Sequence, residues 1–536
     1  MRSTTCHSLT QVRIQSSKYH GGSGVCIKTE KLEIKYRGGP LTRKSLRVSV
    51  VGAPHKQPYA KWRYGDEAAW ESSCKLEGAV RTLDHCNGRV DLESSLLNRS
   101  GWTIVDDSQS VLLGIDDAWV HTRAELDDAR AKDLYVFHYG SEYQQMLDEF
   151  VRLSGRVPLL PRFALGNWYS RWWQYSQAEV TALVALFEHY RIPLSVMVLD
   201  MDWHVVERAA DTSRGWTGYS WNTELFPEHR ALLADLKRRG VRVTLNLHPA
   251  DGVHSHELAY AAVAAKLHVD ASTGEPVPFR CTDARFVESY LTDLHHPHER
   301  DGIEFWWIDW QQGRQSEMRG LDPLYWLNHV HSLDAERPNH PAATREHQRL
   351  RRVILSRWAG LGNHRYPLGF SGDTHTTWES LRFQPYLTQA SANVCFGWWS
   401  HDIGGFGMDG CENEELYIRW VQFGLYSPIL RLHSMKVRVR ASLSPMPRWL
   451  IERSCTGCQR RAEAMGLGLA GADCRRPCHA TPTRVTAVPV HDGVRVSREQ
   501  SSSHSSHVPH APDVGARVPL AAAVLVRLAA ARGSHH

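Results

Sequence analysis

The sequence predicts an α/β fold in which parallel strands alternate with helices, preceded by a domain built mainly of strands. From residue 141 to 434, short apolar runs typical of buried strands alternate with longer segments whose apolar residues recur at helical spacing. Between residues 29 and 140, short alternating runs are separated by Gly, Asp, Asn and Ser, which is typical of a β-sandwich. The 536 residues leave room for both domains.

The N-terminal end carries few signals. Residues 1–28 contain no acidic side chain and no continuous apolar segment, so no secretory signal peptide is visible. We expect a disordered or targeting start there and, because the eleven cysteines form no dense framework, a reduced compartment such as the cytoplasm. The β-sandwich over 29–140 is short for such a domain, which predicts an incomplete first sheet. Its expected strands are 32–36, 46–51, 101–105, 111–113 and 134–139.

A helix over 143–154 leads into the alternating region. Five of the expected parallel strands are apolar runs, at 163–170, 194–199, 241–247, 303–308 and 353–356. Three more lead to Asp373, Asp402 and His433. In a parallel barrel the carboxyl ends of the strands carry the active site, so the polar residues that follow these runs are functional candidates.

Two of these candidates are carboxylates that end apolar runs: Asp309 follows an aromatic-rich run and Asp373 a glycine-containing one. Burying a lone carboxylate is costly unless it is paired or used, although the alternative is a strand-end Asp that caps the next helix. Two carboxylates from the ends of different parallel strands are what glycoside hydrolysis needs. The 20 tryptophans concentrate between residues 168 and 420, which favours sugar stacking, with core packing as the alternative for more than half of them.

Seven motifs stand in order between residues 159 and 434. They are ALGNWYSR at 164–171, VLDMDWH at 198–204, LNLHP at 245–249, WWID at 306–309, Ser356-Arg357 with Gly372-Asp373, HDIGGF at 401–406 and LRLHS at 430–434. Together they resemble glycoside hydrolase family 31, the α-glucosidase and α-xylosidase family. The resemblance implies a (β/α)8 TIM barrel and a retaining mechanism that uses neither a cofactor nor a metal ion.

The resemblance also implies roles for single residues. Asp309 is the implied nucleophile and Asp373 the implied general acid/base, with their carboxyl groups about 5 to 5.5 Å apart. The acid needs a raised pKa, which the charge of Asp309 and partial burial can supply. The implied substrate-binding residues are Asp200, Trp203, His248, Trp306, Arg357, Asp402 and His433. Simple packing is the alternative for the two tryptophans and for His248, and Asp202 is interpreted as structural.

The sequence departs from the family pattern in three places. Trp310, Gln311 and Gln312 follow the nucleophile where most members have Met-Asn-Glu, and Val198 stands where many α-glucosidases have tryptophan, so the sugar preference stays open. After Ser434 the resemblance stops, which indicates a divergent or truncated C-terminal end. We expect most of 435–536 to be irregular or disordered, as a frame error or a decayed gene would produce.

Two features of this tail suggest other functions only weakly. The cysteine pairs at 455/458 and 474/478 have spacing near that of a zinc ribbon, but no glycines follow the pairs, so we expect no metal site. The apolar run at 518–526 is far shorter than the roughly 20 residues of a membrane span. We therefore expect no membrane span.

Charge and motifs together define the expected function. The net charge is only +5 and the Lys and Arg residues are scattered among Asp and Glu, so we expect no nucleic-acid partner. The expected protein is a retaining glycoside hydrolase that cleaves terminal α-linked sugars through a covalent glycosyl-enzyme, with an oligosaccharide or glycoside as its partner. The alternative is an inactive or truncated relative that retains only residual carbohydrate binding. The sequence leaves the linkage and the oligomeric state open.

Overall fold

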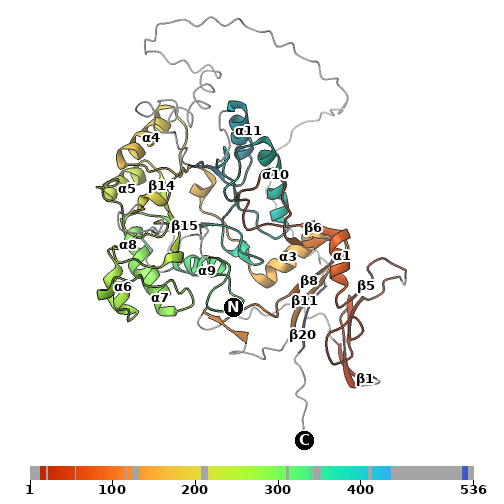
Figure 1. Cartoon of the computed structure of the whole chain (residues 1–536). Coiled ribbons are helices and arrows are strands. Elements are labelled where there is room, and N and C mark those ends of the chain that lie inside the picture. The colour runs from red at the N-terminus through yellow and green to blue at the C-terminus, as the bar shows by residue number, and fades with distance from the viewer. Residues whose placement is uncertain are drawn as a thin grey trace, which may run out of the picture.

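The computed structural model has two parts, a helix-covered barrel and a set of antiparallel sheets beside it. It describes residues 13–19, 22–54, 56–114, 118–123, 132–206, 215–309, 313–337, 340–341, 351, 353–407, 413–435 and 522–528. Figure 1 shows the barrel and its helices on the left and the sheets formed by the N-terminal region at the lower right.

The barrel consists of eight parallel strands in one sheet. Seven of them follow one another in chain order from β12 to β18, and β19 pairs with β12 at the other edge. Two isolated bridges, Ser400 with Ile429 and Ile403 with Leu432, join the two remaining edges, so the barrel is nearly closed. The strands are β12 (Asn167–Tyr169), β13 (Val196–Leu199), β14 (Arg242–Leu247), β15 (Phe305–Ile308), β16 (Ile354–Ser356), β17 (Gly369–Phe370), β18 (Trp399–Ser400) and β19 (Leu430–Leu432).

Helices cover the outside of this sheet, as a parallel sheet requires. The α-helices are α3 (Tyr143–Ser154), α4 (Gln177–His189), α5 (His229–Arg238), α6 (Tyr260–Lys266), α7 (Ala284–Ser289), α8 (His296–Asp301), α9 (Pro323–Ala335), α10 (Trp378–Ala392) and α11 (Glu414–Leu425). Shorter helical turns are η1 (Arg162–Leu165), η2 (Met201–Trp203), η3 (Pro249–Asp251), η4 (Ala271–Thr273), η5 (Tyr290–His295) and η6 (Asn363–Arg365). The helix α4 begins with a capping box. The backbone N–H of Glu179 donates a hydrogen bond to the Ser176 hydroxyl, and the backbone N–H of Ser176 donates one to the Glu179 carboxylate.

Side chains of the barrel strands point alternately inward and outward, and the two sets form separate cores. In β15, Phe305 and Trp307 belong to the apolar interior of the barrel, which also contains Val198. Trp306 points the other way and packs in the layer between the strands and helices α4 and α5. The Asp309 side chain therefore follows on the inward face, because it is two residues beyond Trp307.

The N-terminal region forms antiparallel sheets. A five-stranded sheet contains β1 (Arg13–Tyr19), β2 (Gly22–Lys28), β3 (Leu32–Tyr36), β4 (Leu46–Val50) and β5 (Lys61–Arg63). A second sheet contains β8 (Trp102–Asp106), β11 (Lys132–His138) and β20 (Ala522–Leu528). Smaller elements are α1 (Asp66–Cys74) and the pairs β6 (Lys75–Glu77) with β7 (Ser94–Asn98) and β9 (Leu112–Leu113) with β10 (Val120–His121). The two larger sheets share one apolar core, in which Trp62 of the first sheet packs with Trp102 of the second.

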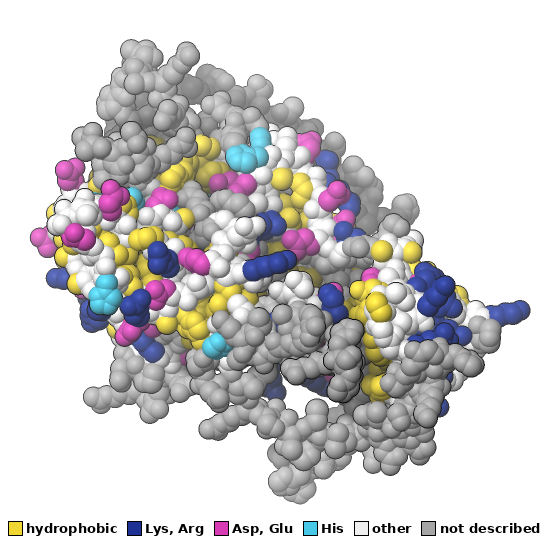
Figure 2. Space-filling model, turned by 60° about the horizontal axis from the view of Figure 1, so that its bottom comes forward, with side chains coloured by type: hydrophobic (Ala, Val, Ile, Leu, Met, Phe, Trp, Pro, Cys, Tyr) yellow, Lys and Arg dark blue, Asp and Glu magenta, His cyan; other side chains and the backbone are white. Residues whose placement is uncertain are grey.

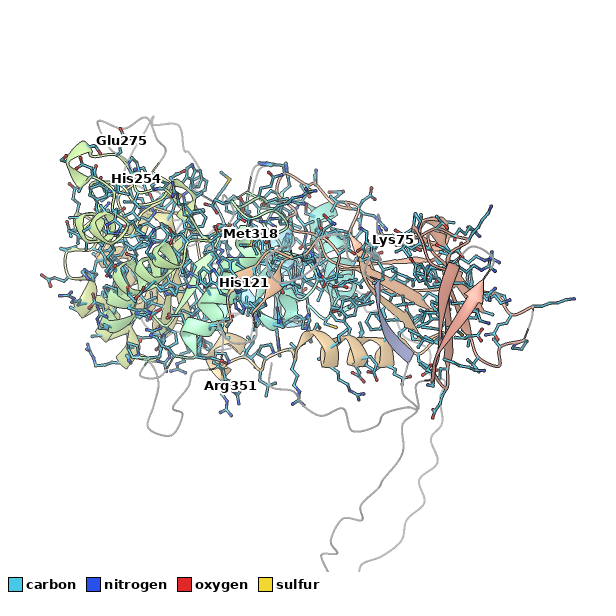
Figure 3. All side chains as sticks on the ribbon, turned by 90° about the horizontal axis from the view of Figure 1, so that it is seen from below. Lys75, His121, His254, Glu275, Met318 and Arg351 are labelled. Atoms are coloured by element: carbon cyan, nitrogen blue, oxygen red, sulfur yellow. The ribbon has the colours of Figure 1, made fainter. Side chains whose placement is uncertain are left out.

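This region also packs against the barrel. Trp119 meets Trp326 of α9 edge to face, with 4.8 Å between the ring centroids, and neighbouring Val120 is buried in a core cluster of the barrel helices. Figure 3, seen from below, labels His121 and Met318 in the middle of the view, between Lys75 on the sheet side and Glu275 at the far end of the barrel. The N-terminal sheets and the barrel are thus joined by an apolar contact.

The fold class predicted from sequence, a TIM barrel preceded by N-terminal antiparallel β-structure, is confirmed. Two elements differ from the expectations for the ends of the chain. Residues 13–19 and 22–28 form the antiparallel pair β1–β2 where a disordered or targeting start was expected, and residues 522–528 form β20 within the expected irregular tail. Both elements are stabilised by strands from other parts of the sequence, since β2 pairs with β3 and β20 pairs with β11. None of the described helices is long and apolar enough to cross a membrane.

Candidate active site

The charged residues expected from sequence gather at one end of the barrel. Each follows its strand by one to three residues, and the carboxyl ends of parallel strands meet on one face. The group consists of Asp200 after β13, His248 after β14, Asp309 after β15, Arg357 after β16, Asp373 after β17, Asp402 after β18 and His433 after β19. Seven of the eight strands therefore contribute a residue to this site.

Asp309 lies at the centre of the group and is 9% exposed. Its Oδ1 accepts from Nε of Arg357 at 3.1 Å, and Nη2 of the same guanidinium is also 3.1 Å away. Its Oδ2 accepts from Nδ2 of Asn246 at 3.2 Å and lies 3.5 Å from Nε2 of His248. The carboxylate is therefore held in one orientation by donors on both oxygens.

Arg357 connects the acidic residues of the site. Its side chain is 2% exposed, and besides Asp309 it contacts Asp84 through Nη1 at 2.7 Å and Asp373 through Nη2 at 3.9 Å. Burial disfavours a charged guanidinium, but the three carboxylates outweigh this effect and raise the pKa of Arg357. The site thus contains a permanent cation between its two candidate catalytic acids.

Asp373 lies at the rim of the site, with 34% of its side chain exposed. Burial against the rest of the site raises its pKa well above the ordinary value, Arg357 opposes this shift, and the charges of Asp84, Asp402 and Asp309 add to it. The raised pKa favours the protonated form, which is the form that a general acid requires.

The N-terminal region contributes residues to this site that the sequence did not predict. Asp84 lies between β6 and β7, and its Oδ1 accepts from the backbone N–H of Asp373 at 2.7 Å as well as from Arg357. Thr82 accepts a hydrogen bond from the same guanidinium. Gly372 permits this close approach, because a Cβ at that position would lie 2.3 Å from Oγ1 of Thr82 and 2.4 Å from Nη1 of Arg357.

A second buried ion pair lies next to the first. Asp402 and Arg431 are both 0% exposed and are hydrogen bonded to each other, and Nε of Arg431 donates to Oγ of Ser400 at 3.0 Å. The guanidinium also lies 5.2 Å from the ring centroids of Trp307 and Phe370. Burial raises the pKa of Asp402 to about 6, although Arg431 and Arg357 oppose the shift. Sequence reasoning included Arg431 in a motif but gave it no role.

Asp200 and His433 lie next to each other in the site, with 4.0 Å between Oδ2 and Nε2. Burial raises the pKa of Asp200 to about 7, and the nearby Asp309 and Asp202 contribute. Burial and the charge of Arg431 lower the pKa of His433 well below its ordinary value, so its ring is neutral. Its Nδ1 is 2.7 Å from Oγ of Ser170, which leaves Nε2 directed towards Asp200.

Aromatic side chains line one side of the group. Phe406 stacks on His433 at 5.3 Å between ring centroids, and Trp172 stacks on Phe406 at 6.3 Å with an angle of only 5° between the planes. Trp216 lies 6.0 Å from Trp172 and 5.3 Å from His248. Trp172 and Trp216 are half-buried, so part of each ring is open to a ligand. These three aromatic residues were not among the candidates from sequence.

The two tryptophans that were among those candidates are packed away from this wall. Trp203 is 1% exposed, and its Nε1 donates to the backbone oxygen of Asn246 at 2.9 Å. Trp306 is 4% exposed on the outer side of β15, where its Nε1 donates to Glu299 of α8 at 2.9 Å. Strand alternation would have favoured Trp307, whose ring lies 5.4 Å from that of His433.

One further group of described residues has the composition of a metal site. His296 and Glu299 of α8 and Asp334 of α9 place their ligand atoms within 4.8 Å of one another. Arg337 already forms ion pairs with both carboxylates. The group is therefore a charge-compensated ion-pair cluster, and Arg337 takes the place that a bound cation would need.

Fold and site together define a class of protein, a (β/α)8 barrel with a cluster of mostly buried acidic side chains at the carboxyl ends of its strands. Residues 157–456 match the family described as "Glycosyl hydrolases family 31 TIM-barrel domain", which is more than half of the chain. The chain belongs to glycoside hydrolase family 31, as the motif order predicted.

The match to individual relatives covers only part of each relative's length. The chain is 27% identical over 393 residues to an alpha-xylosidase of Saccharolobus solfataricus, which covers 69% of this chain and 50% of the relative. It is 25% identical over 330 residues to Alpha-glucosidase 2 of Bacillus thermoamyloliquefaciens, which covers 56% and 40%. The chain thus spans half or less of these relatives. A solved xylosidase from Aspergillus niger shares the fold, with a TM-score of 0.55 at 16% identity over 83% of this chain and 72% of that one.

Proposed function

We propose that this chain is a retaining glycoside hydrolase that removes a terminal α-linked sugar, glucose or xylose, with Asp309 as nucleophile and Asp373 as general acid/base. The observation that carries the proposal is the position of Arg357. Its Nη2 lies 3.1 Å from Oδ1 of Asp309 and 3.9 Å from Oδ1 of Asp373, so these two oxygens are at most 7.0 Å apart. That limit includes the separation of about 5 to 5.5 Å that a retaining pair needs.

The two acids have the different environments that the two roles require. Asp309 accepts hydrogen bonds from Arg357 and Asn246, which favour its charged form and aim one oxygen. Asp373 has a raised pKa and an open side, so it holds a proton where a leaving group can reach it. A nucleophile must be ionised and a general acid protonated at the same pH, and the raised pKa of Asp373 and the donors around Asp309 support this division of roles.

The proposed reaction has two steps. In the first, an oxygen of Asp309 bonds to the anomeric carbon while the glycosidic C–O bond breaks, and the proton of Asp373 passes to the departing oxygen. In the second, Asp373 takes a proton from water, the water oxygen bonds to the same carbon, and the bond to Asp309 breaks. Two inversions at one carbon retain the α configuration.

The remaining residues of the pocket suit the hydroxyl groups of one sugar ring. Asp200 and Asp402, with pKa values of about 7 and 6, can accept hydrogen bonds when ionised and donate when protonated. The neutral His433 offers Nε2 to a hydroxyl, and His248 flanks Asp309. Trp172, Trp216 and Phe406 provide the apolar wall against which a sugar face packs.

Trp203 and Trp306 have indirect roles in this proposal. Trp203 holds the backbone of Asn246, which in turn donates to Asp309, and Trp306 anchors α8. The segment from Trp310 to Gln312 lies outside the described residues, so its effect on sugar preference stays a prediction from sequence.

The stereochemical outcome tests this proposal. We would incubate the full chain with aryl α-xylosides and α-glucosides and follow the first-formed sugar by proton NMR before it mutarotates. The expected product is the α-anomer from at least one of the two series. A β-anomer formed first would contradict the retaining mechanism, and an Asp91→Asn control, in an exposed acid outside the site, should behave as wild type.

A non-catalytic relative that only binds carbohydrate is the second candidate. Cleavage of neither aryl glycoside, together with saturable binding of xylose or glucose that depends on Asp402, would favour this candidate.

A further inference from the structure

The positive charge of this protein is concentrated at one end. Residues 1–63 carry 13 Lys or Arg side chains and only two acidic ones, a net +11, whereas the whole chain has a net charge of +5. The remainder is therefore net acidic. The charges looked scattered in the sequence, and Figure 2 shows Lys and Arg side chains gathered at the end of the molecule where Figure 1 places the five-stranded sheet.

Strand register brings these cations onto one face of that sheet. Lys35 of β3 pairs directly with Arg47 of β4, and Arg47 pairs with Arg63 of β5. In the next row, Lys28 of β2 is opposite Glu33 and Lys61 of β5 is opposite Ser49. Directly paired residues project to the same side of a sheet, so we name this surface the basic face. The basic face consists of Lys28, Lys35, Arg47, Lys61 and Arg63.

The opposite side of the same strands is apolar and buried. Ile34, Val48 and Trp62 alternate with the cations and are at most 2% exposed. The cations themselves are open to solvent, with Lys28, Lys61 and Arg63 exposed and Lys35 and Arg47 half-buried. The basic face is therefore the outer face of the sheet, and the sheet is fixed in place by its core.

A row of three like charges is unfavourable for the sheet. Like charges directly opposite each other in neighbouring strands are destabilising, and strands lie about 4.8 Å apart. Glu33 forms an ion pair with Lys35 at 2.7 Å and has a lowered pKa, first because of that contact and then because of Lys28 and Arg47. Among residues 24–54, 56–70 and 73–114, whose side chains the structure describes, no acidic side chain lies within ion-pair distance of Arg47, Lys61 or Arg63. The face is thus left with several positive charges that have no partner acid among those residues.

We propose that the basic face binds an acidic polysaccharide, a linear chain that carries carboxylate or sulfate groups. Charge complementarity requires an anionic partner with several regularly spaced charges. The outward positions between the cations are Cys26, Glu33 and Ser49. None of these three is aromatic, so among the described side chains of β2 to β5 these positions offer no ring on which a nucleic-acid base could stack, and none of the three is a large apolar residue that could insert into a membrane.

The choice of a polysaccharide rests on the proposed function, whereas the anionic character of the partner does not. A pocket that takes one terminal sugar gains from a second contact that holds the polymer near it, because linked contacts raise the effective concentration of the substrate. The N-terminal region already reaches the pocket through Asp84. The basic face and the site therefore belong to connected parts of the chain.

Affinity electrophoresis of the full chain tests this inference. The probes are polygalacturonate and heparin, with neutral dextran, duplex DNA and phosphatidylserine vesicles for comparison. The test variant is Lys35→Gln/Arg47→Gln/Arg63→Gln, and its matched control is Arg156→Gln/Arg300→Gln/Lys237→Gln, which removes three exposed cations from the barrel side. We expect the test variant to bind one or both acidic polysaccharides at least about tenfold more weakly than wild type, with a smaller salt dependence, and the control to bind as wild type.

Each other outcome of this experiment overturns the inference. Equal binding by the test variant and the control would show that the face is not the site. Tighter binding of DNA or vesicles than of both polysaccharides, lost in the same variant, would assign the face to a different partner. If the triple variant does not fold, Lys61→Gln/Arg63→Gln on the edge strand β5 replaces it. The Asp309→Asn variant should bind like wild type, so a failure of the proposed catalytic function is distinguishable from a failure of this inference.

Discussion

The site in the barrel and the basic face differ in how their positive charges are compensated. In the pocket, Arg357 and Arg431 are almost fully buried and each contacts carboxylates, whereas on the sheet Arg47 and Arg63 lie side by side. The difference follows from solvent. A buried charge is tolerated only with a partner, because desolvation costs several kcal/mol per ion, while water screens an exposed one. The catalysis that we propose for the site therefore depends on paired charges, and the binding that we propose for the basic face depends on charges that remain available.

The largest effect on stability is expected from breaking a buried pair. Arg431→Met leaves Asp402 buried without its partner, and we expect the free energy of unfolding to fall by about 3 to 5 kcal/mol. Arg419→Met is the matched control, because Arg419 pairs with Glu415 on the surface of α11 and should contribute at most about 0.5 kcal/mol. Denaturant unfolding measures both. If the free energy of unfolding of Arg431→Met fell by less than about 1 kcal/mol, the expected difference between buried and exposed ion pairs would be contradicted.

A second substitution tests whether Asp84 positions the groups of the site or only supports the fold. Asp84→Asn removes a charge that raises the pKa of Asp373 and a partner that orients Arg357. We expect kcat to fall by roughly 10- to 100-fold, as for loss of a positioned hydrogen-bonding group. The alkaline limb of the pH profile should move to lower pH, because Asp373 would lose its proton more easily.

The control for this variant is Asp91→Asn, an exposed acid in the same N-terminal segment. It should leave both kcat and the pH profile unchanged. A purely structural role for Asp84 would lower kcat without moving the alkaline limb, and that result would contradict the positioning role.

The pH dependence of stability tests the buried carboxyl group of Asp200. Its pKa of about 7 in the folded protein is raised from 3.8, so its favourable contribution is complete below pH 3.8 and is lost as the pH rises through about 7. The free energy of unfolding of wild type should therefore fall between pH 4 and pH 7.5 by at least about 1 kcal/mol more than that of Asp200→Asn. Denaturant unfolding at these two pH values measures the difference. Identical pH dependence in the two proteins would show that Asp200 is not titrating in this range.

The smallest effect is expected on the basic face. Arg47→Gln relieves repulsion from Lys35 and Arg63, so we expect the free energy of unfolding to change by less than about 0.5 kcal/mol, with stabilisation at low salt. The melting temperature at two salt concentrations measures this. A destabilisation above about 1 kcal/mol would mean that these cations support the fold and are not kept for a partner.

The sequence predicted the residues at strand ends and missed those that come from elsewhere. Asp309 and Asp373 each follow a recognisable apolar run, and parallel strands bring such positions together. Asp84 is 289 residues away from Asp373, and no local pattern marks it as a partner. Trp306 was predicted as a substrate-binding residue, with packing as the alternative, whereas strand alternation places Trp307 on the same face as Asp309.

The basic face was missed for a related reason. Its cations are spread along residues 28–63 with apolar and polar residues between them, so they do not form a run in the sequence. Only the register of β2 to β5 brings Lys35, Arg47 and Arg63 into one row. Register depends on pairing across the sheet, and the sequence alone did not predict it.

The central claim is that Asp309 forms a covalent bond to the sugar, and intact mass spectrometry tests it most directly. The full chain would be incubated with α-configured mechanism-based labels of glucose, galactose and xylose type, beside Asp309→Asn as control. We predict a mass increase of one glycosyl group with the glucose or xylose label, located at Asp309 by peptide mapping and absent from the control. An adduct on another residue, or the same adduct on the Asp309→Asn protein, would contradict the account.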